Sequence, residues 1–267
     1  MSRIETLLRH EHAIVGGALA ALTLLAWVEV WRGAGMGMSA LAMTSVTLFP
    51  HMQADPMGAM RPPAFTWGTV IAMWWVMMIA MMTPSAAPLV LLYGRVVRRA
   101  VGRTGTESVY APALFLILGY LVVWLGFSAV ATALQYVLQR DGIISRALWS
   151  KSALLSATVL VSAGAYQLSP LKRACLRHCR GPVEFLTHAW RPGRTGAFVM
   201  GLEHGVWCLG CCWMLMMLLF VGGVMNVVWI ALLALLVLVE KVAPAGVAVG
   251  RAVGVVLITW GVATLVV

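Results

Sequence analysis

Seven apolar runs, most of them long enough to cross a bilayer as a helix, dominate this sequence. A spanning helix needs about 20 predominantly apolar residues, because the hydrocarbon core of a bilayer is about 30 Å thick. The runs are Ala13–Trp31, Thr66–Ala87, Tyr110–Leu138, Ser152–Ser169, Gly196–Val221, Val224–Val239 and Ala245–Val267. Only 10% of the 267 residues are charged, whereas a soluble domain carries about 25%. We therefore predict an all-α polytopic membrane helix bundle of about seven transmembrane helices, forming a single membrane domain over residues 1–267. A soluble enzyme, a disordered chain and a disulfide-stapled secreted domain are excluded.

The distribution of basic residues predicts the orientation of the bundle. Of the 19 Lys and Arg residues, most fall on one side of the predicted spans, chiefly after the second and fourth runs. Because Lys and Arg accumulate on the cytoplasmic side, we expect residues 1–12 and a basic loop over residues 170–194 to be cytoplasmic. Residues 32–65 then form an outer, Met-rich loop. The net charge of +10 is explained by this bias, so no nucleic-acid partner is expected. The first run exceeds the roughly 7–15 residues of a signal-peptide core, which favours a retained helix.

The fifth run carries the strongest candidate site. On a helix, with His204 placed at 0°, Cys208 lies at about 40°, Cys211 at about −20° and Cys212 at about 80°. Three thiols and an imidazole thus share one face. Soft thiolate ligands select Cu(I) and, with less thioether involvement, zinc, and buried thiolates are costly unless a cation compensates them. The alternative is that these cysteines are small, inert packing residues.

The second run adds a stripe of thioethers. Its methionines recur every four residues, as Met73, Met77 and Met81 and as Met78 and Met82. Pro84 and Pro88 follow, and each removes one backbone hydrogen bond. If this helix contacts the fifth, thioethers and thiols meet near the bilayer centre. The alternative is that Met serves as a flexible core filler.

Two further segments are weaker candidates for metal contact. Cys175, His178 and Cys179 lie in the basic inner segment, where the two cysteines would stand one turn apart on a helix that Gly181-Pro182 ends. His51, Met52 and Met57 lie in the outer Met-rich loop, which resembles a copper-collecting segment. Loop anchoring explains the first set equally well, and lipid docking explains the second.

Two other classes of function remain open from the residues alone. Cys208 and Cys211 form a Cys-x-x-Cys pair preceded by Trp207, which could serve a membrane thiol-disulfide oxidoreductase. The protein could also be a structural or assembly subunit of a membrane complex whose Met and Cys residues only pack. No phosphate-binding loop, Ser-His-Asp set or paired carboxylate is present, so we expect no enzyme of those classes.

Three motifs together resemble one bacterial family of predicted metal-binding integral membrane proteins, long classed as a domain of unknown function. The motifs are Met77-Met-Ile-Ala-Met-Met-Thr-Pro84, Tyr166-Gln-Leu-Ser-Pro-Leu-Lys172 with its following cysteines, and the segment from Gly201 to Met216. Some members are labelled copper chaperones and are linked to copper supply for polyphenol-oxidase-like enzymes. The resemblance spans about residues 66–239 and implies metal handling by Cys208, Cys211, Cys212, Met77, Met78, Met81 and Met82.

These inferences combine into one expected function. We expect a multi-pass protein of the bacterial inner membrane that binds Cu(I), with zinc as the alternative ion. It would deliver the metal to an extracytoplasmic cuproenzyme or across the membrane. The expected partners are the lipid bilayer, the metal ion, and a periplasmic or membrane cuproenzyme or a soluble copper chaperone. No ATP-binding motif is present, so any transport would be passive or ion-coupled.

Overall fold

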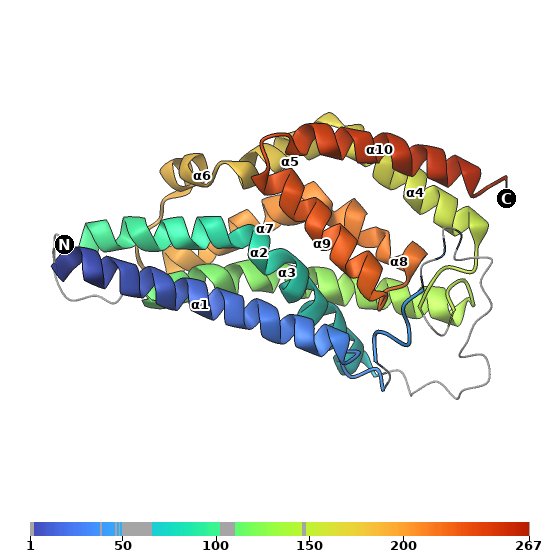
Figure 1. The fold of residues 1–267 in the computed structure, drawn as a ribbon, viewed down its shortest axis with the longest axis horizontal. Coiled ribbons are helices and arrows are strands. Elements are labelled where there is room, and N and C mark those ends of the chain that lie inside the picture. The colour runs from blue at the N-terminus through green and yellow to red at the C-terminus, as the bar shows by residue number, and fades with distance from the viewer. Residues whose placement is uncertain are drawn as a thin grey trace.

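The computed structural model describes residues 3–37, 39–45, 47, 49, 66–101, 110–145 and 148–266, and these form a bundle of helices (Figure 1). The helices are α1 (Arg3–Trp31), α2 (Trp67–Val101), α3 (Tyr110–Arg140), α4 (Ala153–Leu168), α5 (Pro170–Arg180), α6 (Pro182–Ala189), α7 (Gly193–Met217), α8 (Leu219–Gly222), α9 (Val227–Val242) and α10 (Gly246–Ala263). Within the described ranges no β-strand forms. The predicted all-α class is therefore confirmed.

Among the described residues, five helical stretches are long and apolar enough to cross a membrane, or six if the bent pair α4–α5 counts as one span. The five are Ala13–Trp31, Trp67–Arg98, Ala111–Arg140, Gly193–Gly222 and Gly246–Ala263. The prediction of about seven exceeds this number because α4 and α9 have only 16 residues each. A helix of 16 residues is about 24 Å long, which is less than the thickness of the hydrocarbon core.

Most predicted runs correspond to a helix with similar bounds, but α2 is much longer than expected. It continues through Pro84 and Pro88 to Val101, about 14 residues beyond the predicted end at Ala87. The third predicted run, Tyr110–Leu138, agrees with α3 to within two residues. The basic residue Arg95, which we expected in a loop, lies on the last turns of α2. A proline interrupts a single hydrogen bond, and here tertiary packing keeps the helix intact around both of them.

The tightest helix crossing joins α3 and α7, and glycine makes it possible. A Cβ atom added at Gly201 would lie 2.0 Å from the Leu116 carbonyl oxygen, and one at Gly119 would lie 2.1 Å from the Phe198 carbonyl oxygen. Neither position has room for a side chain, so the two backbones are in direct contact. Small residues allow this kind of close approach between apolar helices. The crossing fixes α7, with its cysteines, against Tyr120 of α3.

The basic segment 170–194, predicted as a loop, is largely helical. Ser169 ends α4, where its N–H donates to the Tyr166 carbonyl, and begins α5, where its hydroxyl accepts from the Lys172 N–H. The chain turns by 64° at this point. Gly181 then ends α5, as predicted. The bend places α5 against α7 rather than in solvent, because its inward face carries the buried residues Lys172, Cys175, Leu176 and Cys179.

The two ends of the bundle carry different segments of the chain. In Figure 1, α6 and the final turns of α2 lie toward the same end as the N-terminus, and the C-terminus lies at the opposite end. The described part of the outer segment packs on the start of α9, where the Asn226 amide donates to the Ser45 carbonyl. Met43 of this segment is buried in the core. His51, Met52 and Met57 lie outside the described residues.

Candidate metal centre

The predicted thiol face of α7 is the buried face of that helix. His204, Cys208, Cys211 and Cys212 are each at most 3% exposed, in agreement with the 100° spacing along the helix. Two of the thiols are hydrogen-bonded within the helix: Cys211 and Cys212 both donate to the Cys208 carbonyl, at 3.0 and 3.1 Å. All five cysteines of the chain are free thiols.

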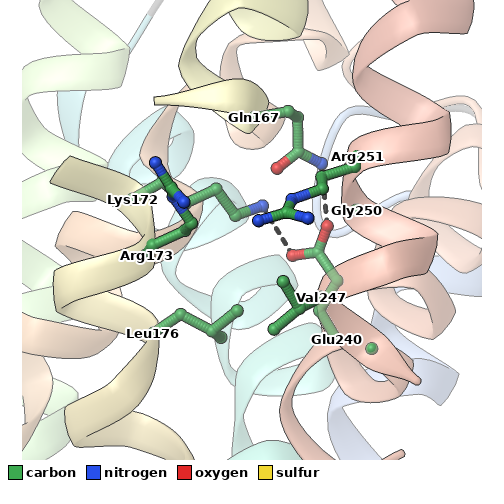
Figure 2. Close-up of a pocket in the computed structure, with 9 residues that line it drawn as sticks. Gln167, Lys172, Arg173, Leu176, Glu240, Val247, Gly250 and Arg251 are labelled. Atoms are coloured by element: carbon green, nitrogen blue, oxygen red, sulfur yellow. Dashed lines mark hydrogen bonds and ion pairs between the residues drawn. The ribbon is translucent and has the colours of Figure 1, made fainter. Parts of the chain in front are cut away.

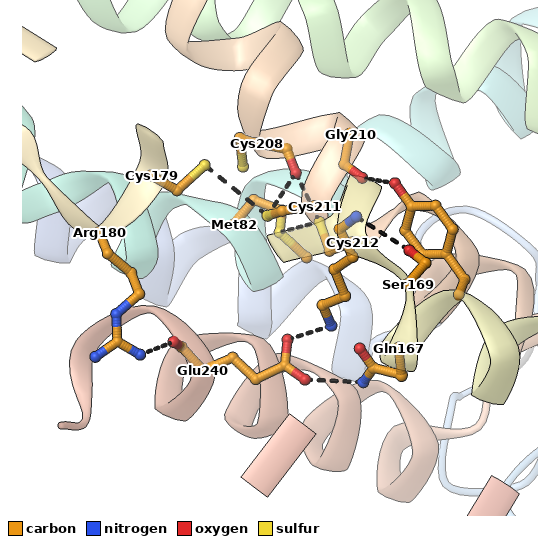
Figure 3. Close-up of polar contacts among 12 residues, drawn as sticks. Met82, Gln167, Ser169, Cys179, Arg180, Cys208, Gly210, Cys211, Cys212 and Glu240 are labelled. Carbon is orange, nitrogen blue, oxygen red and sulfur yellow. Dashed lines mark hydrogen bonds and ion pairs between the residues drawn. The ribbon is translucent and has the colours of Figure 1, made fainter. Parts of the chain in front are cut away.

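A fourth thiol reaches this face from α5. The sulfur of Cys179 lies 3.9 Å from the sulfur of Cys211 (Figure 3). Both side chains are buried, although 32 residues separate them along the chain. We call Cys179, Cys208, Cys211 and Cys212 the thiol cluster. The cluster exists only because the bend at Ser169 turns α5 onto α7.

The methionine stripe of α2 contributes one thioether to this cluster. The sulfur of Met82 lies 4.0 Å from the Cys212 sulfur, although α7 packs mainly on α3 and not on α2. Met77, Met78 and Met81 are equally buried, at 0 to 1% exposed, and belong to the apolar core. Their part in metal binding stays a prediction.

Cys208 has two polar neighbours that the sequence reasoning did not identify. The Lys241 ammonium lies 2.9 Å from the Cys208 sulfur and 3.0 Å from the Ser85 hydroxyl. The Tyr120 hydroxyl lies 3.1 Å from the same sulfur and donates to the Met82 carbonyl at 3.2 Å. Lys241 is only 7% exposed, and a buried ammonium requires compensating partners. The thiol cluster is thus accompanied by a buried cation.

The sixth predicted run ends at Val239, which leaves Glu240 and Lys241 outside the predicted span. The structure corrects this: α9 continues to Val242, and both charged residues are buried within it. Two adjacent ionisable residues inside an apolar run are themselves a sign of a functional or paired site. That pattern was the available signal for including Lys241.

His204 is buried beside the cluster between two aromatic rings. Its ring centroid lies 5.9 Å from that of Tyr120 and 5.3 Å from that of Phe185. Among the described residues, its buried Nδ1 atom has no hydrogen-bond partner. Unpartnered buried nitrogens are uncommon in native structures, so this atom is available to a ligand.

The other two candidates of the inner segment are placed differently. Cys175 is buried against Gly210, where an added Cβ would lie 3.0 Å from the Cys175 sulfur. His178 is exposed and stacks on Trp207, with ring centroids 4.1 Å apart and planes 6° apart. These contacts explain both residues as packing contacts between α5 and α7.

A buried charge network fastens α5 to α9 next to the cluster. The Lys172 ammonium lies 2.6 Å from one oxygen of the Glu240 carboxylate, and the Gln167 amide donates to the other oxygen at 2.8 Å (Figures 2 and 3). Arg180 donates to the carbonyls of Glu240 and Ala243, both at 2.8 Å. The last residues of α9 are therefore capped by α5, which holds Cys179 and Lys241 in fixed relation.

Glu203 pairs with a basic residue of the segment that precedes α7. Its carboxylate lies 3.8 Å from the Arg191 guanidinium, and both side chains are substantially exposed. It lies away from the thiol cluster face of α7.

The sulfur separations allow shared coordination of one ion. With metal–sulfur bonds of about 2.3 Å, the 3.9 Å between the Cys179 and Cys211 sulfurs corresponds to an S–metal–S angle of about 115°. Among the described residues, however, no group of three His, Cys, Asp or Glu side chains already surrounds a single point. Any third ligand would come from a side-chain rotation or from the Met82 thioether.

Residues 71–264 match the model of the PpoB2 family, which is described as a copper chaperone. The match covers well over half of the chain and contains the whole thiol cluster, Met82 and Lys241. The protein belongs to this family. The resemblance seen in the sequence is thereby confirmed, and the description of the PpoB2 family names a chaperone and not an enzyme. The Met-rich residues 32–65 lie outside the matched range. No curated protein and no solved structure matches the chain.

Proposed function

We propose that this PpoB2-family protein is a membrane-embedded carrier that binds Cu(I) in the thiol cluster and delivers it to a recipient. The observation that supports this most directly is the approach of Cys179 on α5 to Cys211 on α7. Helical periodicity alone explains why three thiols lie on one face of α7. It does not explain why a fourth thiol, from a separate short helix, is buried against them.

The ligand chemistry favours a monovalent soft ion. Thiolates and thioethers select Cu(I) over harder divalent ions. Cu(I) held by two thiolates carries one negative charge, and the buried Lys241 ammonium next to Cys208 compensates it. Zn(II) is the less suitable ion, because closed zinc sites use four ligands. The described residues present only pairs of sulfur atoms that are close enough to bind one ion together.

The surface of the helices supports a location in a membrane. Large apolar side chains are exposed along several helices, including Leu24 and Leu25 of α1 at 65 and 66% and Val130 of α3 at 67%. An apolar surface of this extent is expected toward lipid and not toward water. We propose the bacterial inner membrane as the location, with residues 1–12 and helices α5 and α6 on the cytoplasmic side.

The direction of delivery follows from this orientation. The cluster lies beside the cytoplasmic helix α5, so a soluble copper chaperone is a suitable donor. The recipient is an extracytoplasmic cuproenzyme, or the far side of the membrane if the protein transports copper.

The proposal is tested by the copper content of single variants. Detergent-purified protein grown with copper under reducing conditions should contain close to one copper per chain, and Cys179→Ser should lose most of it. Cys175→Ser is the matched control, because Cys175 is a buried thiol one turn earlier on α5. Equal copper in both variants, or none in well-folded wild type after Cu(I) loading, would refute the proposal. A redox-titratable Cys208–Cys211 pair in copper-free protein would instead support the oxidoreductase alternative.

If instead a triple Cys208, Cys211 and Cys212 to Ser variant keeps full function in cells, the structural-subunit alternative holds. That result would show that the three thiols of α7 are packing residues and not metal ligands.

A further inference from the structure

A cavity of about 190 Å³ leads from the surface to the thiol cluster. Its outer lining includes Pro88 and Val242, which are exposed, whereas Cys179, His204 and Lys241 are buried at its inner end. Of the four thiols of the cluster, Cys179 is the one that lines the cavity. A molecule arriving through it therefore meets Cys179 first.

The lining carries positive charge without an acidic counterpart. Arg180 and Lys241 line the cavity, and none of its nine lining residues is acidic. Arg180 donates to backbone carbonyls, including those of Glu240 and Ala243, which carry no net charge. Lys241 contacts Ser85 and Cys208 at the inner end. A cleft lined by one sign of charge attracts ions of the opposite sign and raises their association rate.

His204 provides a neutral ligand at the inner end of the same cavity. Its Nδ1 atom is buried and has no hydrogen-bond partner, and the residue is only 3% exposed. An imidazole nitrogen and a thiol thus line the same cavity as the two cations. This combination suits an anion that itself contains a soft metal.

We propose that the cavity is the access route of the copper donor and that it selects Cu(I) presented as an anionic thiolate complex over the free cation. This inference rests on the proposed function for its cargo, but its charge selectivity concerns the cavity alone. Arg180 and Lys241 attract the complex, His204 offers a transient ligand, and Cys179 makes the first exchange.

The exchange conserves charge and electrons. Cu(I) moves from two donor thiolates to two cluster thiols, and each departing donor sulfur takes up the proton of the thiol that replaces it. Copper stays Cu(I), no disulfide forms, and the bound complex keeps one negative charge. No oxidant or reductant is required.

The charge selectivity is measured by thiol labelling of metal-free wild-type protein. Two methanethiosulfonate reagents are compared, one with an anionic sulfonatoethyl group and one with a cationic trimethylammonioethyl group, and peptide mass spectrometry identifies the labelled cysteine over time. We expect Cys179 to be labelled first. Relative to a small thiol in solution, the ratio of anionic to cationic rates should rise by about 10-fold or more.

Variants at Arg180 separate charge from structure. Arg180→Gln should remove most of the preference, whereas Arg180→Lys, which keeps the charge, should retain it. Arg177→Gln is the matched control, because Arg177 lies one turn earlier on α5, is exposed and does not line this cavity. A preference for the cationic reagent, first labelling at another cysteine, or an equal effect of Arg177→Gln would overturn the proposal.

A loading assay connects the cavity to the cargo. Cu(I) is supplied either as its anionic bis-thiolate complex with dithiothreitol or as its cationic acetonitrile complex, and copper per chain is followed over time. Loading from the anionic complex should slow in Arg180→Gln by about the factor seen in labelling, and loading from the cationic complex should not. The labelling experiment needs no metal, so the two proposals can fail separately. If the cavity prefers the anionic reagent but the protein retains no copper, the proposed function is refuted and the charge selectivity of the cavity holds.

Discussion

The direct backbone contact between α3 and α7 allows a quantitative prediction for Gly119→Ala. The added Cβ would lie 2.1 Å from the Phe198 carbonyl oxygen and 2.9 Å from the Leu202 nitrogen. Ordinary contact for such a carbon begins at 3.4 Å, so the helices have to separate by about 1 Å. Overpacking of a tight core costs about 1–3 kcal/mol, and the loss of dispersion contacts along the opened crossing adds to this. We expect a loss of about 3 kcal/mol.

The control for this change lies on the same helix. Gly126 is on α3 two turns further along, and a Cβ there would meet no atom within 4 Å. Gly126→Ala should be neutral or stabilising by up to about 1 kcal/mol, because alanine favours a helix more than glycine does. The two variants should thus differ by about 3–4 kcal/mol, or about 6–16 °C in Tm at roughly 2–4 °C per kcal/mol.

The free cysteines supply the assay. Cys175, Cys208, Cys211 and Cys212 are buried and do not line the cavity, so their reaction with a fluorogenic thiol reagent reports unfolding of the detergent-solubilised protein as it is heated. Gly119→Ala should also retain less copper, since Tyr120, the next residue, contacts the Cys208 sulfur at 3.1 Å. Melting of Gly119→Ala within about 1 °C of Gly126→Ala would show that the two backbones are not in contact.

Three further predictions concern charge and exposure. Lys172→Met leaves the Glu240 carboxylate buried without its ion pair, which costs about 3–5 kcal/mol of stability. Changing both residues to Met should recover most of this loss. Chemical denaturation of the single and double variants tests this, and equal losses of stability would contradict it. His178→Ala should leave copper per chain unchanged in elemental analysis, because this exposed residue stacks on Trp207 of α7 and lies away from the thiol cluster. Arg191→Gln should change stability by less than about 1 kcal/mol in thermal denaturation, since its pair with Glu203 is largely exposed and such pairs contribute little.

The local part of the site was predictable from the sequence. The shared face of Cys208, Cys211 and Cys212 follows from helical periodicity, and all of these residues are buried as expected. Gly181 ends α5 as the Gly-Pro pair predicted. In both cases the information lies within two or three turns of one helix, where residue spacing fixes direction.

The long-range part was not predictable in the same way. Lys241 reaches Cys208 across 33 positions, and Tyr120 reaches it across 88. No periodicity within one helix encodes such contacts. The charge of Lys241 favoured the wrong interpretation, namely that the helix ends before it, because a basic residue near the end of an apolar run also marks the membrane boundary. The packing of residues 170–180 against α7 was hidden by their high density of basic residues, because the buried pairing of Lys172 with Glu240 is a long-range contact.

The bend at Ser169 has a consequence for how the site could release its cargo. Three thiols of the cluster belong to α7, which is fixed to α3 by glycine contacts, whereas Cys179 alone is carried by the short helix α5. A rotation of α5 about Ser169 would therefore reduce the cluster from four thiols to three and leave the long apolar helices where they are. The Lys172–Glu240 pair and the Arg180 hydrogen bonds oppose this rotation. The number of sulfur atoms around the ion thus depends on whether α5 is docked on α7. Docking of this short helix would therefore set the affinity of the cluster for the metal ion.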